Sequence, residues 1–445
     1  MHNMKQVLHS FVSLSNQAVD GAAMPQGAPK TRRLLGEIHQ PVEGDASRTA
    51  RLPVRGQGTV AFNVKNFGPT PPQSYRVHLL AADSRPVAVV TVKDTAIEVE
   101  LLDKNGQRRT ATSSRLPEGL RLIGFTPSDM FIWASMDRAN GTIQVGDGYM
   151  MRRNTRITLA PGAEVSLRDM QRAIEEIGQA RIDDEVELAS NTKISRMPVV
   201  LDPPPVVIDR NSITLEHLAR NDAIADSTLP EEAQYLYGTV AGNNITLSPR
   251  DAAAIDFSLD TEGMTLFEKV KEKLTEFGDD PKMVYIRVTI GPDEGDSPGS
   301  PFVLEIWPKG CYSPVHSHSE TVAVIKVLHG DIKVRWYNPL AQKDNDHLAP
   351  LMEQTFSRGD VTWLTPEMYQ THKLENPRTD TMCATIQSYR YLDRDNQHYE
   401  FFDYVSPDPG VKEKQQFRPD SDYELLDLLR IVRHEYDNHG PGKSS

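Results

Sequence analysis

The sequence is poor in cysteine, in positive charge and in long apolar runs, and each shortage excludes a class of protein. Only two cysteines, Cys311 and Cys383, occur among 445 residues, so a disulfide framework is excluded and a reducing, intracellular setting is favoured. The formal net charge of −13 argues against a nucleic-acid-binding surface and against attraction to anionic lipid. No apolar run approaches the length of a membrane span, and the first residues lack the apolar core of a secretory signal. We therefore expect a cytoplasmic protein that acts on small molecules, with neither nucleic acid nor membrane as a partner.

The composition and hydrophobic pattern of the chain change along its length and predict separate segments within a mainly β protein. Residues 1–57 mix small, polar, Pro and Gly positions without periodicity, so we expect a mostly disordered lead-in. Short β-branched runs separated by turn residues follow over 58–160 and are typical of a β-sandwich. Residues 161–230 predict a helix and a Pro-rich linker, because the triple proline at 203–205 cannot join a central strand. Residues 231–445 return to strands with a few flanking helices, which predicts a small antiparallel β-barrel.

Within 58–160, the runs VAFNVKNF, YRVHLLAA and FIWASMDRANGTIQVGDG carry a family likeness. They resemble the farnesoic acid O-methyltransferase-like domain, which implies a β-sandwich module. No Gly-rich cofactor loop that would support methyl transfer accompanies them, so we expect a binding or assembly domain of unknown ligand. Trp133 lies in the last run and can stack on a ligand, but an aromatic at alternating spacing is more typical of a core, where we expect it.

The stretch GCYSPVHSHSETVAVIKVLHG, residues 310–330, places two histidines close together before a β-branched run. Alternate side chains of a strand share a face, so His316 and His318 can reach one metal ion. Taken alone, a His-x-His pair is also explained by two surface side chains at a strand end. A third imidazole, His372, lies in the later segment GDVTWLTPEMYQTHKLEN. Three imidazoles can hold a divalent metal and leave positions open for other ligands.

Glycine, histidine and asparagine positions of two motifs in this region are similar to those of the cupin superfamily. Many metal cupins add a glutamate at the place of Val322 or Ala323, whereas Glu320 lies too early in the chain. A three-histidine set without that carboxylate is the departure found in thiol dioxygenases. The motif positions are Gly310, His316, His318, Gly330, His372 and Asn376.

Further positions of the expected barrel belong with these motifs. They are Tyr285-Ile286-Arg287, Trp307, the segment 313–318, the segment 372–376 and Tyr389. With them, residues 262–410 resemble the type I cysteine dioxygenase family across most of the expected barrel. The likeness implies one Fe(2+) per chain, held by the three histidines. It also implies L-cysteine and O2 as substrates and cysteine sulfinate as the product.

Further site residues follow from alternation and from the resemblance. Arg287 and Tyr285 lie two residues apart, so both can face one cavity, where a guanidinium can bind a carboxylate. The resemblance implies that Arg287 holds the substrate carboxylate beside Tyr285, and that Tyr389 lies near the iron as a catalytic residue. Thr385 and Gln387 share a strand face with Tyr389 and are expected to support it. Gln387 replaces a histidine that family members commonly show, and an amide cannot change charge near neutral pH.

Two alternatives to an L-cysteine dioxygenase stay open. The substitution at Gln387 leaves room for another small thiol carboxylate, such as 3-mercaptopropionate. The altered residues and the large amino-terminal module also fit a catalytically silent cupin that acts as a binding or interaction protein. Arg287 has an alternative of its own, an exposed strand residue with no part in a site.

Overall fold

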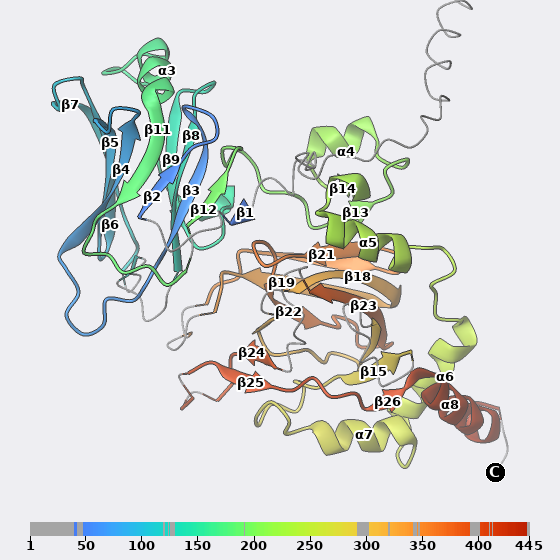
Figure 1. The fold of residues 1–445 in the computed structure, drawn as a ribbon. Coiled ribbons are helices and arrows are strands. Elements are labelled where there is room, and N and C mark those ends of the chain that lie inside the picture. Colours follow the sequence, from blue (N-terminus) through green and yellow to red (C-terminus); the bar gives the residue numbers. More distant parts are fainter. Residues whose placement is uncertain are drawn as a thin grey trace, which may run out of the picture. The chain divides into compact units, whose positions relative to one another are not determined.

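The computed structural model describes residues 40–41, 48–118, 121–122, 124, 130–190, 192–291, 302–318, 321–340, 345, 348–391, 401–408, 410–411 and 413–442. These residues form a mainly β structure, which confirms the fold class predicted from the strand pattern (Figure 1). Residues 1–39 and 42–47, most of the expected lead-in, lie outside the described residues, and so does Glu320. Within the described part of the chain, no helix is long and apolar enough to cross a membrane.

The amino-terminal part of the described chain forms two antiparallel sheets of six strands each. The strand order of one is β1 (Gln40–Pro41), β12 (Lys193–Ser195), β3 (Gln57–Val64), β8 (Met130–Asp137), β9 (Thr142–Asp147) and β10 (Thr155–Leu159), with the short 3-10 helix η1 (Arg152–Asn154) before β10. The order of the other is β2 (Thr49–Arg51), β11 (Ile177–Ile182), β4 (Ser74–Ala81), β5 (Pro86–Lys93), β6 (Ala96–Leu102) and β7 (Arg108–Arg115).

Alternating burial builds the core of these sheets. In β6, Ile97, Val99 and Leu101 are buried while the residues between them are half-buried, which is the period-two pattern of a strand with one face inward. Trp133 in β8 is buried, and its Nε1 donates to the Tyr149 carbonyl at 3.2 Å. The prediction that Trp133 is a core residue is therefore confirmed.

A helix in this part is shorter than its sequence pattern suggests. Helix α3 (Leu167–Glu176) begins after Ser166, whose side chain accepts a hydrogen bond from the Asp169 N–H. The helical periodicity runs on into β11, where the chain is extended instead, because β11 pairs with both β2 and β4. This ladder outweighs the local helical preference. The amino-terminal sheets consequently include strands outside the expected range 58–160.

The proline-rich segment 203–205 is buried and packs against strand β21 (Val361–Leu364). Trp363 Nε1 donates to the Pro204 carbonyl at 3.1 Å, and the Tyr369 hydroxyl donates to the Pro203 carbonyl. The prolines therefore pack against the residues of the later segment that contains β21. The short elements that follow are β13 (Val207–Ile208), α4 (Leu215–Arg220), β14 (Ile224–Ala225) and the 3-10 helix η2 (Asp226–Thr228), with β13 and β14 paired in parallel.

The carboxy-terminal part forms two further six-stranded sheets. The order of the first is β21, β18 (Thr321–His329), β23 (Cys383–Tyr391), β16 (Phe302–Trp307), β15 (Ile286–Ile290) and β26 (Tyr423–Glu424). The order of the second is β20 (Met352–Ser357), β19 (Asp331–Tyr337), β22 (Thr371–Glu375), β17 (His316–Ser317), β24 (Phe402–Tyr404) and β25 (Gln415–Phe417).

The barrel expected for this part is not closed. Among the described residues, the two carboxy-terminal sheets are separate hydrogen-bonded ladders. The chain crosses between them repeatedly, and one of these crossings is the tight turn at Gly330, between β18 and β19. Gly330 has a φ of +68°, and a Cβ there would lie 2.5 Å from the Met382 carbonyl oxygen, so glycine is required.

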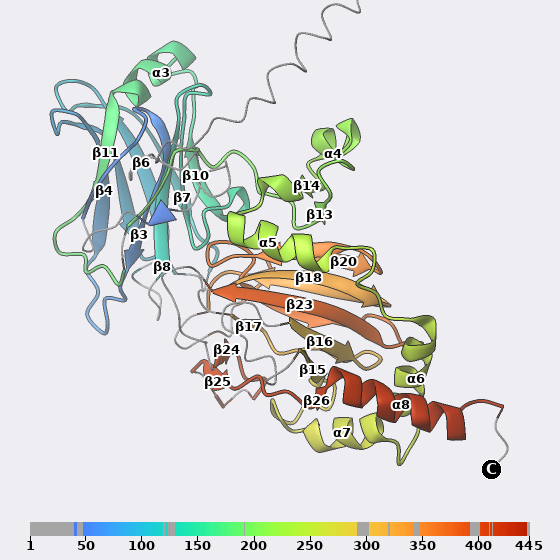
Figure 2. The same ribbon diagram turned by 45° about the vertical axis from the view of Figure 1, so that its right-hand side comes forward.

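Helices pack on the outside of the carboxy-terminal sheets. Helix α5 (Glu231–Val240) contacts β18 and β23, as both ribbon views show (Figures 1 and 2). Helix α6 (Pro249–Asp260) contacts α7 (Thr265–Lys273) and α8 (Leu425–His439). Apolar side chains fill most of the space that these elements enclose, and the polar groups described next are buried among them.

Candidate metal centre

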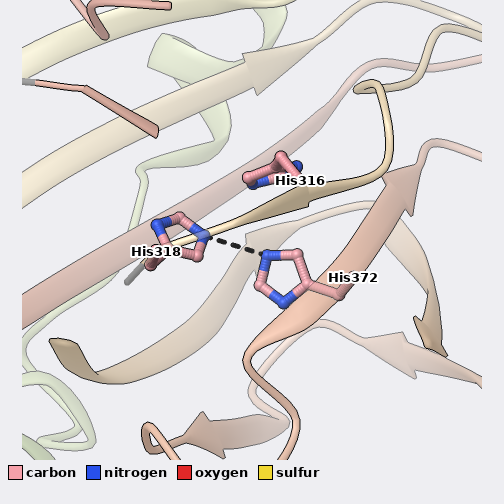
Figure 3. Close-up of side chains that lie close together, drawn as sticks. All are labelled: His316, His318 and His372. Carbon is pink, nitrogen blue, oxygen red and sulfur yellow. Dashed lines mark hydrogen bonds between the residues drawn. The ribbon is translucent and has the colours of Figure 1, made fainter. Parts of the chain in front are cut away.

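Three histidines meet in the interior of the carboxy-terminal part, and we call His316, His318 and His372 the imidazole cluster (Figure 3). His316 begins β17 and His318 follows its last residue, so the extended chain turns both rings to one side. His372 in β22 is the antiparallel partner of His316, and directly opposed residues share a face. The structure therefore brings together the three side chains that the sequence predicts.

The geometry of the imidazole cluster is compact. One ring nitrogen from each histidine lies within 4.8 Å of those of the other two, and all three side chains are buried. The ring centroids are 4.7 Å apart for His316 and His372, 4.8 Å for His316 and His318, and 5.0 Å for His318 and His372. The Nε2 atoms of His318 and His372 approach to 3.1 Å, the contact dashed in Figure 3.

Backbone carbonyls hold two of the three rings in place. His316 Nδ1 lies 3.1 Å from the Pro314 carbonyl oxygen, and His372 makes a hydrogen bond with the backbone of Tyr369. A ring nitrogen that donates to a carbonyl fixes the tautomer and leaves the other nitrogen with a lone pair for a metal. His318 Nδ1 is buried, and among the described residues it has no hydrogen-bond partner.

Burial also fixes the charge of the imidazole cluster. Desolvation lowers the pKa of His316 to about 4 and takes the pKa values of His318 and His372 well below the ordinary range. The rings are therefore neutral near pH 7, as metal ligation requires. Buried, neutral nitrogens that converge in this way fit a divalent transition metal, and this group can hold one.

Arg287 lies on β15 and is buried, but it does not stand alone. Its Nη1 donates to Glu305 Oε1 at 2.9 Å, and both residues are less than a tenth exposed, at 8% and 4%. Desolvation raises the pKa of Glu305 to about 7, and the neighbouring Arg287 charge limits the rise. The sequence reasoning did not identify Glu305 as a site residue.

Gln387 and Tyr389 continue this arrangement from β23. Gln387 Nε2 donates to Glu305 Oε2, and the Tyr389 hydroxyl donates to Gln387 Oε1. The Tyr389 ring lies 5.3 Å from the His318 ring, and the Arg287 guanidinium lies 5.9 Å from the Tyr389 ring centroid. We call Arg287, Glu305, Gln387 and Tyr389 the charged network, and its tyrosine borders the imidazole cluster.

The other two predicted site residues pack against one tryptophan. Tyr285 is buried and stacks on Trp307 with ring centroids 4.7 Å apart. Thr385 is also buried, and its Oγ1 accepts a hydrogen bond from Trp307 Nε1 at 3.2 Å. Thr385 lies on β23 and Tyr285 directly precedes β15, so both contact Trp307 from next to the charged network.

Phe402 is a second residue that sequence reasoning missed. Its ring centroid lies 4.3 Å from that of His318 and 6.4 Å from that of His316. Phe402 begins β24, which pairs with β17, so the strand that carries His316 has this aromatic at its side. The run EFFDYV gives a strand signal, but nothing in it marks Phe402 as a neighbour of the histidines.

No family model matches the chain. Among the solved structures that it resembles is the Schizosaccharomyces pombe Cnp3 cupin domain, 12% identical over 25% of this chain and 68% of that one, with a TM-score of 0.20. A cupin domain of an XRE family transcriptional regulator from Enterobacter cloacae is 10% identical over 24% of this chain and 97% of that one, with a TM-score of 0.19. A recombinant oxalate oxidase in complex with glycolate is 14% identical over 22% of this chain and 44% of that one, with a TM-score of 0.18. At these TM-scores the similarities carry no conclusion about activity or ligand.

Proposed function

We propose that this protein is an iron(II)-dependent thiol dioxygenase, with one iron per chain, that converts a small thiol such as L-cysteine into its sulfinic acid. The observation that carries the proposal is the imidazole cluster, in which three buried, neutral rings bring ligand nitrogens within 4.8 Å of one another. Nitrogen ligands of this kind suit iron(II) and leave open positions. Among the described residues no carboxylate belongs to the group, in keeping with the resemblance to thiol dioxygenases.

The reaction balances without a further oxidant or reductant. A thiol R–SH and O2 give R–SO2H: the O–O bond breaks, both oxygen atoms become bonded to sulfur, and the electrons that sulfur loses reduce the dioxygen. Bound iron(II) would supply the place where a substrate thiolate and dioxygen meet.

The chain's own residues contribute orientation and shielding from water. Burial keeps the three imidazoles deprotonated, so they are available as ligands without displacement of protons near pH 7. Tyr389 is held by Gln387 with its ring beside His318, so its phenol lies at the edge of the imidazole cluster. Phe402 supplies an apolar wall next to His318, which keeps bulk water from that side.

The test is oxygen uptake by the full-length protein loaded with iron(II). With L-cysteine we expect one dioxygen consumed per thiol and a product that carries both atoms of isotope-labelled dioxygen on sulfur, identified by mass spectrometry. Protein without iron should show neither. Oxygen consumption that yields only cystine would contradict the proposal, because a disulfide contains no oxygen from O2.

Two comparisons separate the alternatives. Parallel assays with 3-mercaptopropionate show whether another thiol carboxylate is the better substrate. Metal analysis of the purified protein addresses the silent cupin: a chain that contains no iron and takes none up would leave the interaction protein as the better account. The role of the amino-terminal sheets as an accessory domain of unknown ligand stays a prediction.

A further inference from the structure

The charged network lies in a row across three neighbouring strands. In the ladder of β15 with β16, Arg287 is directly opposite Glu305, and in that of β16 with β23, Glu305 is directly opposite Thr385. Directly opposed residues of antiparallel strands project from the same face of a sheet. Gln387 and Tyr389 follow Thr385 at two-residue steps, so they share that face as well.

Glu305 is the centre of this row because each of its two carboxylate oxygens has a partner. Oε1 accepts from Arg287 Nη1 at 2.9 Å, and Oε2 accepts from Gln387 Nε2. A buried guanidinium and a buried carboxylate in direct contact compensate each other's charge. The positive charge of Arg287 is therefore already paired with Glu305 before any substrate carboxylate binds.

The pair of Arg287 and Glu305 lies close enough to the imidazole cluster to interact with a bound substrate. Arg287 lies 5.9 Å from the ring centroid of Tyr389, and that ring lies 5.3 Å from the ring of His318. A small thiol bound beside the imidazole cluster would place its second functional group within reach of this network. A second carboxylate there would be attracted by Arg287, and Glu305, which contacts Arg287, offsets that attraction with its own negative charge in the low dielectric of the buried site.

We infer that Glu305 is a specificity-determining residue, which compensates Arg287 and turns the site away from thiol carboxylates and toward small aminothiols. The inference rests on the proposed function. An ionised carboxylate offers about four acceptor positions, so Glu305 can accept from an ammonium group while it keeps Arg287 and Gln387. 2-Aminoethanethiol should therefore be preferred over L-cysteine, and L-cysteine over 3-mercaptopropionate, which has a carboxylate and no amine.

The ionisation of Glu305 decides the conditions of the test. Burial raises its pKa to about 7, while the charges of Arg287 on β15 and Lys273 on α7 act in the opposite direction. The phenols of Tyr285 and Tyr389 also lie near it, and the pKa of Tyr285 is raised well above its ordinary value by burial and by Glu305. Assays at about pH 8 keep Glu305 ionised and the Tyr285 phenol neutral.

The experiment compares the wild type with Glu305→Gln, which keeps the shape and most hydrogen bonds of the side chain and removes its charge. In the wild type, kcat/KM should be highest for 2-aminoethanethiol and lowest for 3-mercaptopropionate. In Glu305→Gln, the ratio between these two thiols should fall by about 10-fold or more, because a change of that size needs only about 1.4 kcal/mol of lost repulsion. Glu353→Gln is the matched control, since Glu353 pairs with Arg335 at 3.1 Å but is exposed on β20, and its ratio should equal that of the wild type.

Binding supplies a readout apart from turnover. Cobalt(II)-loaded protein should bind the three thiols in the same order of affinity. The change in its absorption spectrum when a thiolate coordinates the metal measures this binding. Thermal unfolding shows whether Glu305→Gln is folded. If it is not, the order of affinities in the wild type still tests the inference.

The outcomes separate the inference from the proposed function. If no thiol is oxidised by the iron-loaded protein, the proposed function fails. If thiols are oxidised but the wild type prefers 3-mercaptopropionate or L-cysteine over 2-aminoethanethiol, only the inference is overturned. A ratio in Glu305→Gln equal to that of the wild type and of Glu353→Gln would likewise overturn the role of Glu305.

Discussion

The imidazole cluster and the charged network lie side by side in the same interior, are buried to the same degree, and yet differ in whether their polar atoms are satisfied. In the cluster, two Nε2 atoms face each other at 3.1 Å, and His318 Nδ1 has no hydrogen-bond partner among the described residues. In the network, donors and acceptors are matched from Arg287 through Glu305 to Gln387. Buried polar groups without partners cost free energy, so the cluster is the region that a ligand would complete. In the network, each Glu305 oxygen already has one partner within the chain.

Burial acts on the two regions in opposite directions because their charged forms have opposite signs. It lowers the pKa of His316 to about 4 and raises the pKa of Glu305 to about 7. The imidazoles become neutral ligands, whereas Glu305 stays close to its titration range. One buried environment therefore leaves three neutral imidazoles that can hold a metal and, next to them, a carboxyl that titrates near neutral pH.

The largest expected effect follows from the cluster. His372→Ala removes one of the three proposed ligands, so activity should vanish. Loss of a residue that only hydrogen-bonds to a ligand lowers metal affinity roughly 10- to 100-fold, and loss of a ligand itself should lower the affinity for iron(II) by more. Metal content after dialysis and oxygen uptake check this. His329→Ala is the control, because His329 is half-buried and bonds Thr381 at 3.1 Å outside the cluster, and it should keep both metal and activity. Full iron content in His372→Ala would refute the assigned ligand set.

The charged network should respond through stability. Glu305→Leu leaves Arg287 buried without its partner and should lower the free energy of unfolding by about 3–5 kcal/mol, and Arg287→Leu should cost a similar amount. The double variant should recover most of the loss, because a buried ion pair and an apolar pair of similar size are often nearly equal in stability. Urea unfolding of the four proteins measures the coupling.

The comparison pair for that cycle is Arg335 and Glu353, which are 3.1 Å apart with Glu353 about half exposed. Exposed pairs contribute about 1 kcal/mol or less, so Glu353→Leu should have a small effect, and Arg335→Leu, which also loses Glu375 at 2.6 Å, a somewhat larger one. A double variant of Arg287 and Glu305 whose loss equals the sum of its two single losses would show that the pair is not coupled.

The sequence predicts the cluster well because its signals are local. His316 and His318 are fixed on one side of the chain by two-residue spacing, and His372 is recognisable from the strand segment that contains it. Trp133 is predicted as core from the same alternation, and it is buried. What the sequence does not supply is closure, since the strands expected to form one barrel alternate between two separate sheets along the chain.

The network was predicted only in part because its partners depend on which strands become neighbours. FVLEIW contains one carboxylate inside an apolar run, and a buried acid needs a partner, so Glu305 carries a usable signal. The identity of that partner is decided by the register of β15 on β16, which opposes Arg287 and Glu305. Phe402 is placed by the pairing of β24 with β17, which joins residues far apart in the chain.

A smaller effect is expected from pH. The pKa of Glu305 rises from an ordinary 4.5 to about 7 on folding, so the folded state binds the extra proton between these values. The stability that this carboxyl contributes is present below about pH 4.5 and is lost as the pH rises through about 7. The wild type should therefore lose roughly 3 kcal/mol relative to Glu305→Gln across this range, measured by urea unfolding at a series of pH values. A difference between the two proteins that does not change with pH would contradict the raised pKa.

The smallest effect is expected where the two regions meet. Tyr389→Phe removes one hydroxyl that donates to Gln387, while Gln387 keeps its bond to Glu305, so the free energy of unfolding should fall by about 1 kcal/mol. Tyr369→Phe is a matched control, because that buried hydroxyl donates to the Pro203 carbonyl and should cost a similar amount of stability. Both variants should keep their iron, but only Tyr389→Phe should lower kcat severalfold, since only its phenol lies beside the ring of His318. Equal kcat values in the two variants would assign Tyr389 to packing alone, and the boundary between the imidazole cluster and the charged network would then carry no part of the reaction.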